Sequence, residues 1–261
     1  MNFDFTGFLF FVFGAVFGSF LNVCIHRFPR GESIVSPGSH CPHCSAPVHW
    51  FDNIPLVSYL FLIGRCRKCR AGISPRYFMV EMATALIWLF FYIFYGVTAT
   101  SVVGIYLFTV LLAVTCTDFE TGYIPDKFTL PSIVAGLVLS CIYPEIQDKT
   151  SWYMALLNSF GGFLIGGGIL LVTGMIGNIL FKKESMGGGD IKLLAMLGAF
   201  LGVKKIILVF LIAPIMALPL ALYAKYYKRH ETIPFGPFIA MAGAWMFLYG
   251  NRIWEQFFSI Q

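Results

Sequence analysis

Charged side chains are scarce in this sequence. Only 12% of its 261 residues are Asp, Glu, Lys or Arg, whereas 58% are hydrophobic. A soluble domain of this length could not bury so much apolar surface, so the composition excludes an ordinary soluble protein. We therefore expect a membrane protein.

The apolar residues occur in long runs, several of which approach the roughly 20 residues that a helix needs to cross a bilayer. The short alternating segments typical of a β-barrel are missing. The sequence thus predicts an all-α polytopic membrane protein with about eight transmembrane helices. They are expected at Phe5–Ile25, Phe78–Tyr95, Ser101–Thr117, Phe128–Tyr143, Met154–Phe181, Ile191–Gly202, Ile206–Tyr223 and Pro237–Tyr249.

The first apolar run lacks the basic leader and the cleavage site of a signal peptide, and Arg27 and Arg30 follow it. We expect a retained helix with its N-terminus outside the cell membrane. Most Lys and Arg residues then fall in cytoplasmic loops, as the positive-inside rule requires. The net charge of +5 is explained by this topology and gives little support to a nucleic-acid role. The loops expected on the cytoplasmic side are 26–77, 118–127, 182–190 and 224–236.

The one sizeable hydrophilic segment contains CPHC and CRKC motifs. Two C-x-x-C motifs at this separation are typical of a tetrahedral four-cysteine zinc site. A cytoplasmic location argues against disulfides. The alternatives are a redox pair and four unconnected cysteines, and we favour zinc over both. The zinc would be structural, because four thiolates leave no position for a water molecule. The expected ligands are Cys41, Cys44, Cys66 and Cys69.

Two aspartates are predicted where membrane helices meet the cytoplasm. Asp118 ends the third span, before Gly122 and Pro125, and Asp190 follows the glycines 187–189 at the start of the sixth. Either residue alone is explained as a helix cap or an interfacial charge. Two carboxylates at one membrane face favour catalysis, because such a pair shares a proton and can activate water.

Motifs of several other classes are missing. The sequence has no H-E-x-x-H element, which a zinc metalloprotease requires, and no G-x-G-x-x-G element of a Rossmann-type donor site. A transporter could also use paired carboxylates, but these two are expected at an interface and no internal repeat is visible.

Sequence blocks in a fixed order surround these motifs. The cysteine motifs lie among the blocks GSFLNVCIHRFPR, DNIPLVSYL and ISPRYFMVEMATA. Three further blocks come later in the chain: DFETGYIPD, GGGDIKLLAMLGA and IPFGPFIAMAG. Nearly end to end, the chain resembles the type IV prepilin peptidases, the bifunctional leader peptidases and N-methyltransferases of type IV pilus and type II secretion systems. It departs from the family pattern at Tyr59 and Phe78, where Trp and Pro are usual.

The resemblance implies an aspartic endopeptidase of the bacterial inner membrane with its active sites facing the cytoplasm. Asp118 and Asp190 would be catalytic. The substrate would be a membrane-inserted prepilin or pseudopilin, cut after a glycine that precedes its apolar segment. A presenilin-like protease shares the G-x-G-D element but lacks the four-cysteine loop. The supporting residues of the peptidase site would be Gly187, Gly189, Asp126 and Lys192.

The resemblance also implies methylation of the new N-terminal amine with S-adenosylmethionine. We expect the methyltransferase part, with its zinc, at 27–77, between a first helix at 1–26 and a seven-helix peptidase domain at 78–261. Glu81 would orient the substrate amine or form a structural ion pair with Arg76 or Arg27. The methyltransferase candidates are Asn22, Arg27, Asp52, Asn53, Gly64, Arg76 and Glu81.

Overall fold

A computed structural model describes residues 4–182, 186–224 and 234–258. These residues form α-helices, two short 3-10 helices and two isolated β-bridges, which confirms the prediction of an all-helical protein. The chain divides into two compact units, Met1–Ala113 and Val114–Gln261, and the division falls inside α4 (Ala99–Thr121). These limits differ from the predicted domains at 1–26, 27–77 and 78–261, which are defined by function and stay a prediction.

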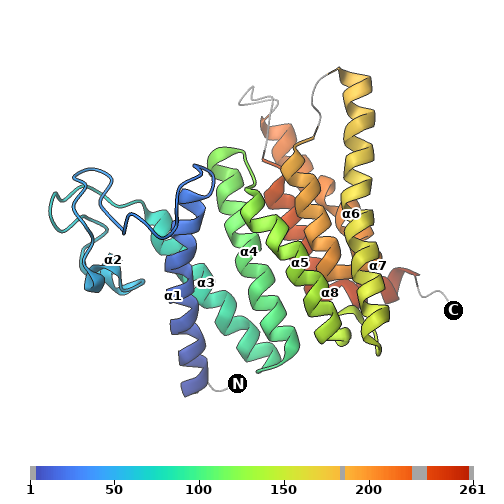
Figure 1. Cartoon of the computed structure of the whole chain (residues 1–261), viewed down its shortest axis with the longest axis horizontal. Coiled ribbons are helices and arrows are strands. Elements are labelled where there is room, and N and C mark those ends of the chain that lie inside the picture. Colours follow the sequence, from blue (N-terminus) through green and yellow to red (C-terminus); the bar gives the residue numbers. More distant parts are fainter. Residues whose placement is uncertain (1–3, 183–185, 225–233, 259–261) are drawn as a thin grey trace. The chain divides into compact units, whose positions relative to one another are not determined.

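In the first unit, α1 (Phe5–Arg27) packs along α3 (Pro75–Tyr95) (Figure 1). Small residues on α1 allow the two main chains to approach. A Cβ added at Gly18 would lie 2.7 Å from the Cα of Glu81, so only glycine fits there. This contact is the kind that small residues provide between membrane helices.

Along the chain, the predicted four-cysteine segment connects α1 to α3. It is mostly loop, with a 3-10 helix η1 (Trp50–Asn53) and a short helix α2 (Val57–Phe61). Neither element is predicted from the sequence, because both are too short to carry a helical period.

The second unit contains the end of α4 and four long helices (Figure 1). The contact between α6 and α7 is the most extensive, and both α5 and α8 pack on α7. The elements of this unit are α5 (Asp126–Ile142), η2 (Pro144–Gln147), α6 (Trp152–Phe181), α7 (Gly188–Tyr223) and α8 (Gly236–Phe258).

Glycines bring the main chains of α6 and α7 into contact. Gly162 of α6 lies directly against Gly198 of α7. One turn on, a Cβ added at Gly166 would lie 2.5 Å from the carbonyl oxygen of Leu194. Gly168, by contrast, has open space where a Cβ would be. The glycine-rich run therefore serves helix packing on one face of α6.

A break at Gly202 divides α7. The backbone there has φ +75° and ψ 179°, which is far from a helical conformation. Leu194 before the break and Ile206 after it both lie against Gly166 of α6. The chain therefore turns back at Gly202, and its two arms run beside the same part of α6. They correspond to the separate sixth and seventh spans that the sequence predicts.

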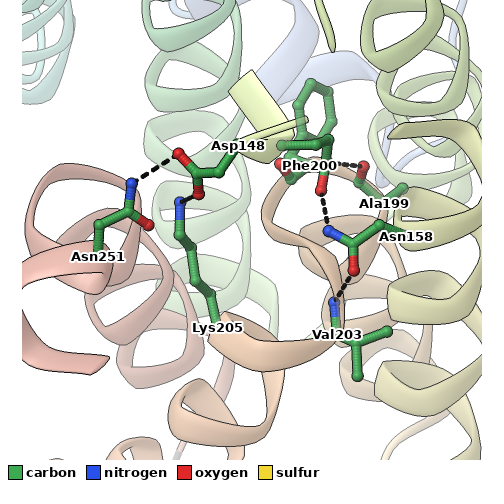
Figure 2. Close-up of polar contacts among 8 residues, drawn as sticks. Asp148, Asn158, Ala199, Phe200, Val203, Lys205 and Asn251 are labelled. Carbon is green, nitrogen blue, oxygen red and sulfur yellow. Dashed lines mark hydrogen bonds and ion pairs between the residues drawn. The ribbon is translucent and has the colours of Figure 1, made fainter. Parts of the chain in front are cut away.

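Side-chain amides replace hydrogen bonds that the break removes. The Gln147 amide donates to the carbonyl oxygen of Phe200 at 2.9 Å. The Asn158 side chain accepts a hydrogen bond from the N–H of Val203 at 3.3 Å (Figure 2). Buried main-chain groups need such partners wherever a helix is interrupted, above all in a membrane.

Within the described residues, five helices are long and apolar enough to cross a membrane: α1, α3, α4, α6 and α7. They support the predicted multi-pass membrane protein. The predicted fourth and last spans fall in α5 and α8, which are not among the five. The count of eight transmembrane helices therefore stays a prediction.

Substitution of Gly162 by Ala should destabilise the protein by about 1–3 kcal/mol, because the added methyl group meets main-chain atoms that cannot move aside. Gly168→Ala is the matched control on the same helix, and it should change stability by less than about 0.5 kcal/mol. Unfolding of the purified variants in mixed micelles measures both. Equal stability of the two variants would contradict the packing account.

Candidate functional site

The four predicted zinc ligands lie in two turns of the same shape. In each turn the N–H of the first cysteine donates to a carbonyl oxygen further along, at 2.9 Å in the first turn and 2.8 Å in the second. Each turn also contains a residue in the left-handed conformation, Ser45 with φ 55° and Arg70 with φ 60°. Each C-x-x-C motif thus folds into a tight turn that presents two sulfurs.

The sulfurs of Cys41, Cys44, Cys66 and Cys69 all lie within 4.8 Å of one another, which excludes the alternative of unconnected cysteines. The Sγ atoms of Cys41 and Cys69 are 3.8 Å apart. A tetrahedral metal with Zn–S bonds of about 2.3 Å places its sulfurs about 3.8 Å apart, so the site fits a zinc ion. Backbone N–H groups of Cys69 and Lys68 lower the pKa of the Cys66 thiol to about 6, which favours the thiolate that a metal binds.

Asp52 supports the second cysteine turn. Its carboxylate pairs with the Arg67 guanidinium at 2.6 Å, and the hydrogen bonds from Arg67 lower the pKa of Asp52 below its usual range. Asn53 follows in η1. Gly64 has φ +61° and packs against Tyr59, where a side chain would clash with the ring hydroxyl. Asp52 and Gly64 therefore have contacts that shape the metal-binding turns.

Asn22 and Glu81 lie where α1 meets α3. The Asn22 side chain donates to the carbonyl oxygen of Tyr77 at 2.9 Å. The Arg76 guanidinium lies over the Tyr77 ring, 4.8 Å from its centroid. Glu81 is buried and accepts a hydrogen bond from the N–H of Leu56 at 2.7 Å. The structure thus connects Glu81 to the loop that follows the first cysteine turn.

Arg27 holds the loop after α1. Its guanidinium is buried and donates to the carbonyl oxygens of Ser33 at 2.7 Å and Pro37 at 2.6 Å. Three residues that are separated in the sequence are thereby fixed together. This arrangement gives Arg27 a structural role in shaping the entry to the cysteine segment.

Asp118 is buried in the last turn of α4. Gly122 ends the helix with φ +63°, and its N–H donates to the carbonyl oxygen of Asp118 at 2.9 Å. The Asp118 carboxylate accepts a hydrogen bond from the N–H of Gly236, at the start of α8, with a distance of 3.0 Å. A main-chain donor from another helix therefore orients this carboxylate.

Asp190 lies in the first turn of α7, and its carboxylate accepts a backbone hydrogen bond from Gly187. The helix-cap interpretation is therefore part of its role. The carboxylate is also close enough to Asp118 for their negative charges to repel each other. The structure thus brings together the two aspartates that the sequence singles out.

Ile124 fills the space between the helix ends that carry this site. A Cβ added at Gly189 would lie 2.9 Å from the Ile124 side chain, so glycine lets the start of α7 approach it closely. Nearby, Lys192 of α7 pairs with Asp126 of α5 at 2.6 Å. The four supporting residues predicted from the sequence thus all lie at the ends of helices that meet here.

The N–H of Gly236 is the part of the site that sequence reasoning missed. The available signal was Gly-Pro at a helix start, where the first N–H groups have no partner within the helix. A Cβ at this position would lie 2.8 Å from Asp118 Oδ2, so the residue must be glycine.

Comparison with known proteins assigns the chain to a family. Residues 12–95 match the Bacterial Peptidase A24 N-terminal domain, and residues 105–222 match the Type IV leader peptidase family. The prepilin leader peptidase/N-methyltransferase of Aeromonas hydrophila is 34% identical over 275 residues, which cover 94% of this chain and 91% of that protein. The chain belongs to the type IV leader peptidase family.

Other relatives of this leader peptidase agree. The prepilin leader peptidase/N-methyltransferase of Klebsiella pneumoniae is 38% identical over 200 residues, covering 74% of this chain and 83% of the relative. The type 4 prepilin-like proteins leader peptide-processing enzyme of Escherichia coli O78:H11 is 34% identical over 249 residues, covering 88% and 89%. No solved structure matches the chain. Family membership makes the chain an enzyme with peptidase and methyltransferase activity.

Replacement of Cys66 by Ser should abolish metal binding, because three thiolates and a hydroxyl bind zinc far more weakly than four thiolates. The purified leader peptidase should carry about one zinc per chain, measured by inductively coupled plasma mass spectrometry. Cys24→Ser, a change at a cysteine buried in α1, is the matched control and should keep the metal. A protein without bound metal, or a Cys66→Ser variant that retains it, would contradict the assignment.

Proposed function

We propose that this enzyme removes the leader peptide of type IV prepilins or pseudopilins at the cytoplasmic face of the inner membrane, using Asp118 and Asp190. It cuts after a glycine and then methylates the new N-terminal residue with S-adenosylmethionine. The observation that carries the peptidase proposal is that the end of α4 and the start of α7 bring Asp118 and Asp190 close enough for their charges to interact, while the N–H of Gly236 orients Asp118.

The chemistry follows from the proximity of two acids. Two carboxylates that repel each other hold one proton between them. The ionised member takes a proton from water as the water oxygen attacks the peptide carbonyl. The protonated member donates a hydrogen bond to the carbonyl oxygen and then supplies a proton to the leaving amine. Hydrolysis therefore needs no covalent intermediate.

The helix ends give the substrate access to this site. Gly187 carries no side chain that would keep an extended peptide away from the Asp190 carboxylate, while Gly189 lets the start of α7 pack on Ile124. Asp126 and Lys192 join the starts of α5 and α7 and so support the position of Asp190. The apolar segment of a prepilin would remain in the bilayer while its leader reaches the aspartates.

The proposed topology has eight crossings. Division of α7 at Gly202 gives two arms, which with the other six long helices make the predicted number. With the N-terminus outside, the ends of α4 and α7 that carry the aspartates face the cytoplasm, as does the cysteine segment. A soluble methyl donor then reaches the same side of the membrane.

The methyltransferase activity is assigned to the segment 27–77 and the helix ends beside it. Zinc held by the four cysteines would fix the shape of this segment, because a four-thiolate site leaves no position for a reacting group. Glu81 is the strongest candidate to hold the substrate amine, since it is a buried carboxylate near the start of α3. Asn22 and Arg76 both contact Tyr77, one helical turn before Glu81 on α3.

Asp118→Asn and Asp190→Asn should each lower leader cleavage by at least about 100-fold, because each removes one of the groups that transfer the proton. Cleavage of a purified prepilin, followed by gel mobility with enzyme in lipid nanodiscs, measures the rate. Glu145→Gln, at an exposed carboxylate of the same unit, is the matched control and should cleave normally. Normal cleavage by either aspartate variant would rule out the aspartyl mechanism.

Glu81→Gln tests the methyltransferase assignment. The amide oxygen can still accept the hydrogen bond from Leu56, whereas the charge that would hold an amine is lost. We expect cleaved pilin whose N-terminal mass lacks one methyl group, with metal content and cleavage unchanged. Glu81→Ala, which removes both the charge and the hydrogen bond, serves for comparison. Full methylation by the Glu81→Gln enzyme would assign this residue a purely structural role.

A further inference from the structure

The segment Trp50–Ile63, which we call the apolar loop, exposes large hydrophobic side chains. Trp50 is 81% exposed, Phe61 83% and Ile63 82%. Leu60 and Val57 are exposed as well. A soluble surface rarely carries so many neighbouring apolar side chains unless they face a partner or a membrane.

The middle of the apolar loop packs against α1 and α3. Leu56 is buried in one apolar cluster with Ala15 of α1 and Ala85 of α3. Its N–H also donates to the carboxylate of Glu81. Glu81 lies about 9 Å from the start of α3 at 1.5 Å per residue, and α3 is one of the helices that are long and apolar enough to cross a membrane. The apolar loop is therefore fixed beside a membrane helix and not above it.

Basic side chains follow the apolar loop directly. Arg65, Lys68 and Arg70 are all exposed around the second cysteine turn. A surface that combines apolar side chains with a neighbouring group of cations suits the boundary between acyl chains and anionic headgroups. Phe17 of α1 and Leu86 of α3 are exposed apolar side chains of the same unit.

We propose that the apolar loop inserts into the cytoplasmic leaflet of the bilayer. Trp50, Phe61 and Ile63 lie among the upper acyl chains, and Arg65, Lys68 and Arg70 contact anionic headgroups. The four-cysteine segment is thereby held against the membrane surface, where a substrate emerges. The proposal depends on the membrane location of α1 and α3 and not on the aspartyl chemistry, so the two can fail separately.

Fluorescence of Trp50 in the full-length enzyme tests this location. The protein is placed in nanodiscs of phosphatidylglycerol and phosphatidylethanolamine, with or without bromine on the acyl chains, which quenches tryptophan on contact. The emission of Trp50 is the difference between wild type and Trp50→Phe. We expect most of this emission to be lost in brominated nanodiscs and little to be lost on addition of aqueous acrylamide. Phe61→Trp, made in the Trp50→Phe protein, should behave in the same way.

Two results would overturn the proposal. Equal Trp50 emission in both kinds of nanodisc, with strong quenching by acrylamide, would place the loop in water. Protection from acrylamide that appears only after a prepilin is added would identify the loop as a protein-docking surface. Zinc content is measured on every variant and establishes that the four-cysteine segment is folded.

Discussion

Main-chain contact between α6 and α7 determines where Asp190 lies, and much of the second unit depends on it. Gly162 and Gly198 let the two helices touch without side chains between them. Such contact replaces the hydrophobic effect, which does not drive helices together inside a bilayer. The first arm of α7 is thereby fixed along α6, and the helix start that bears the carboxylate is held in place.

The break at Gly202 is stabilised by polar contacts, in contrast to the apolar contact between α6 and α7. A sharp turn between two helical arms leaves several main-chain groups without helical partners. Gln147 and Asn158 supply them from neighbouring elements. The same unit therefore contains an apolar contact that determines the helix spacing and a polar cluster that determines where the helix turns back.

Apolar runs and glycines made most of the helices predictable. Gly122 and Gly202 end helical segments where the sequence indicates, because their left-handed φ values suit glycine best. The cysteine spacing likewise predicted that the four cysteines form one cluster. The contact of Leu56 with α3 was not predictable, since no local pattern records a tertiary contact. The donor at Gly236 was missed because a main-chain N–H has no residue type of its own.

The hydrogen bond from Gly236 to Asp118 has a further consequence. Since the donor belongs to the main chain, it does not depend on the type of a side chain, and the bond is lost when the first turn of α8 moves away from the end of α4. The carboxylate on α4 and the position of α8 are therefore mechanically coupled. Displacement of α8 therefore alters the hydrogen bonding of a buried carboxylate on another helix without any change of side chain.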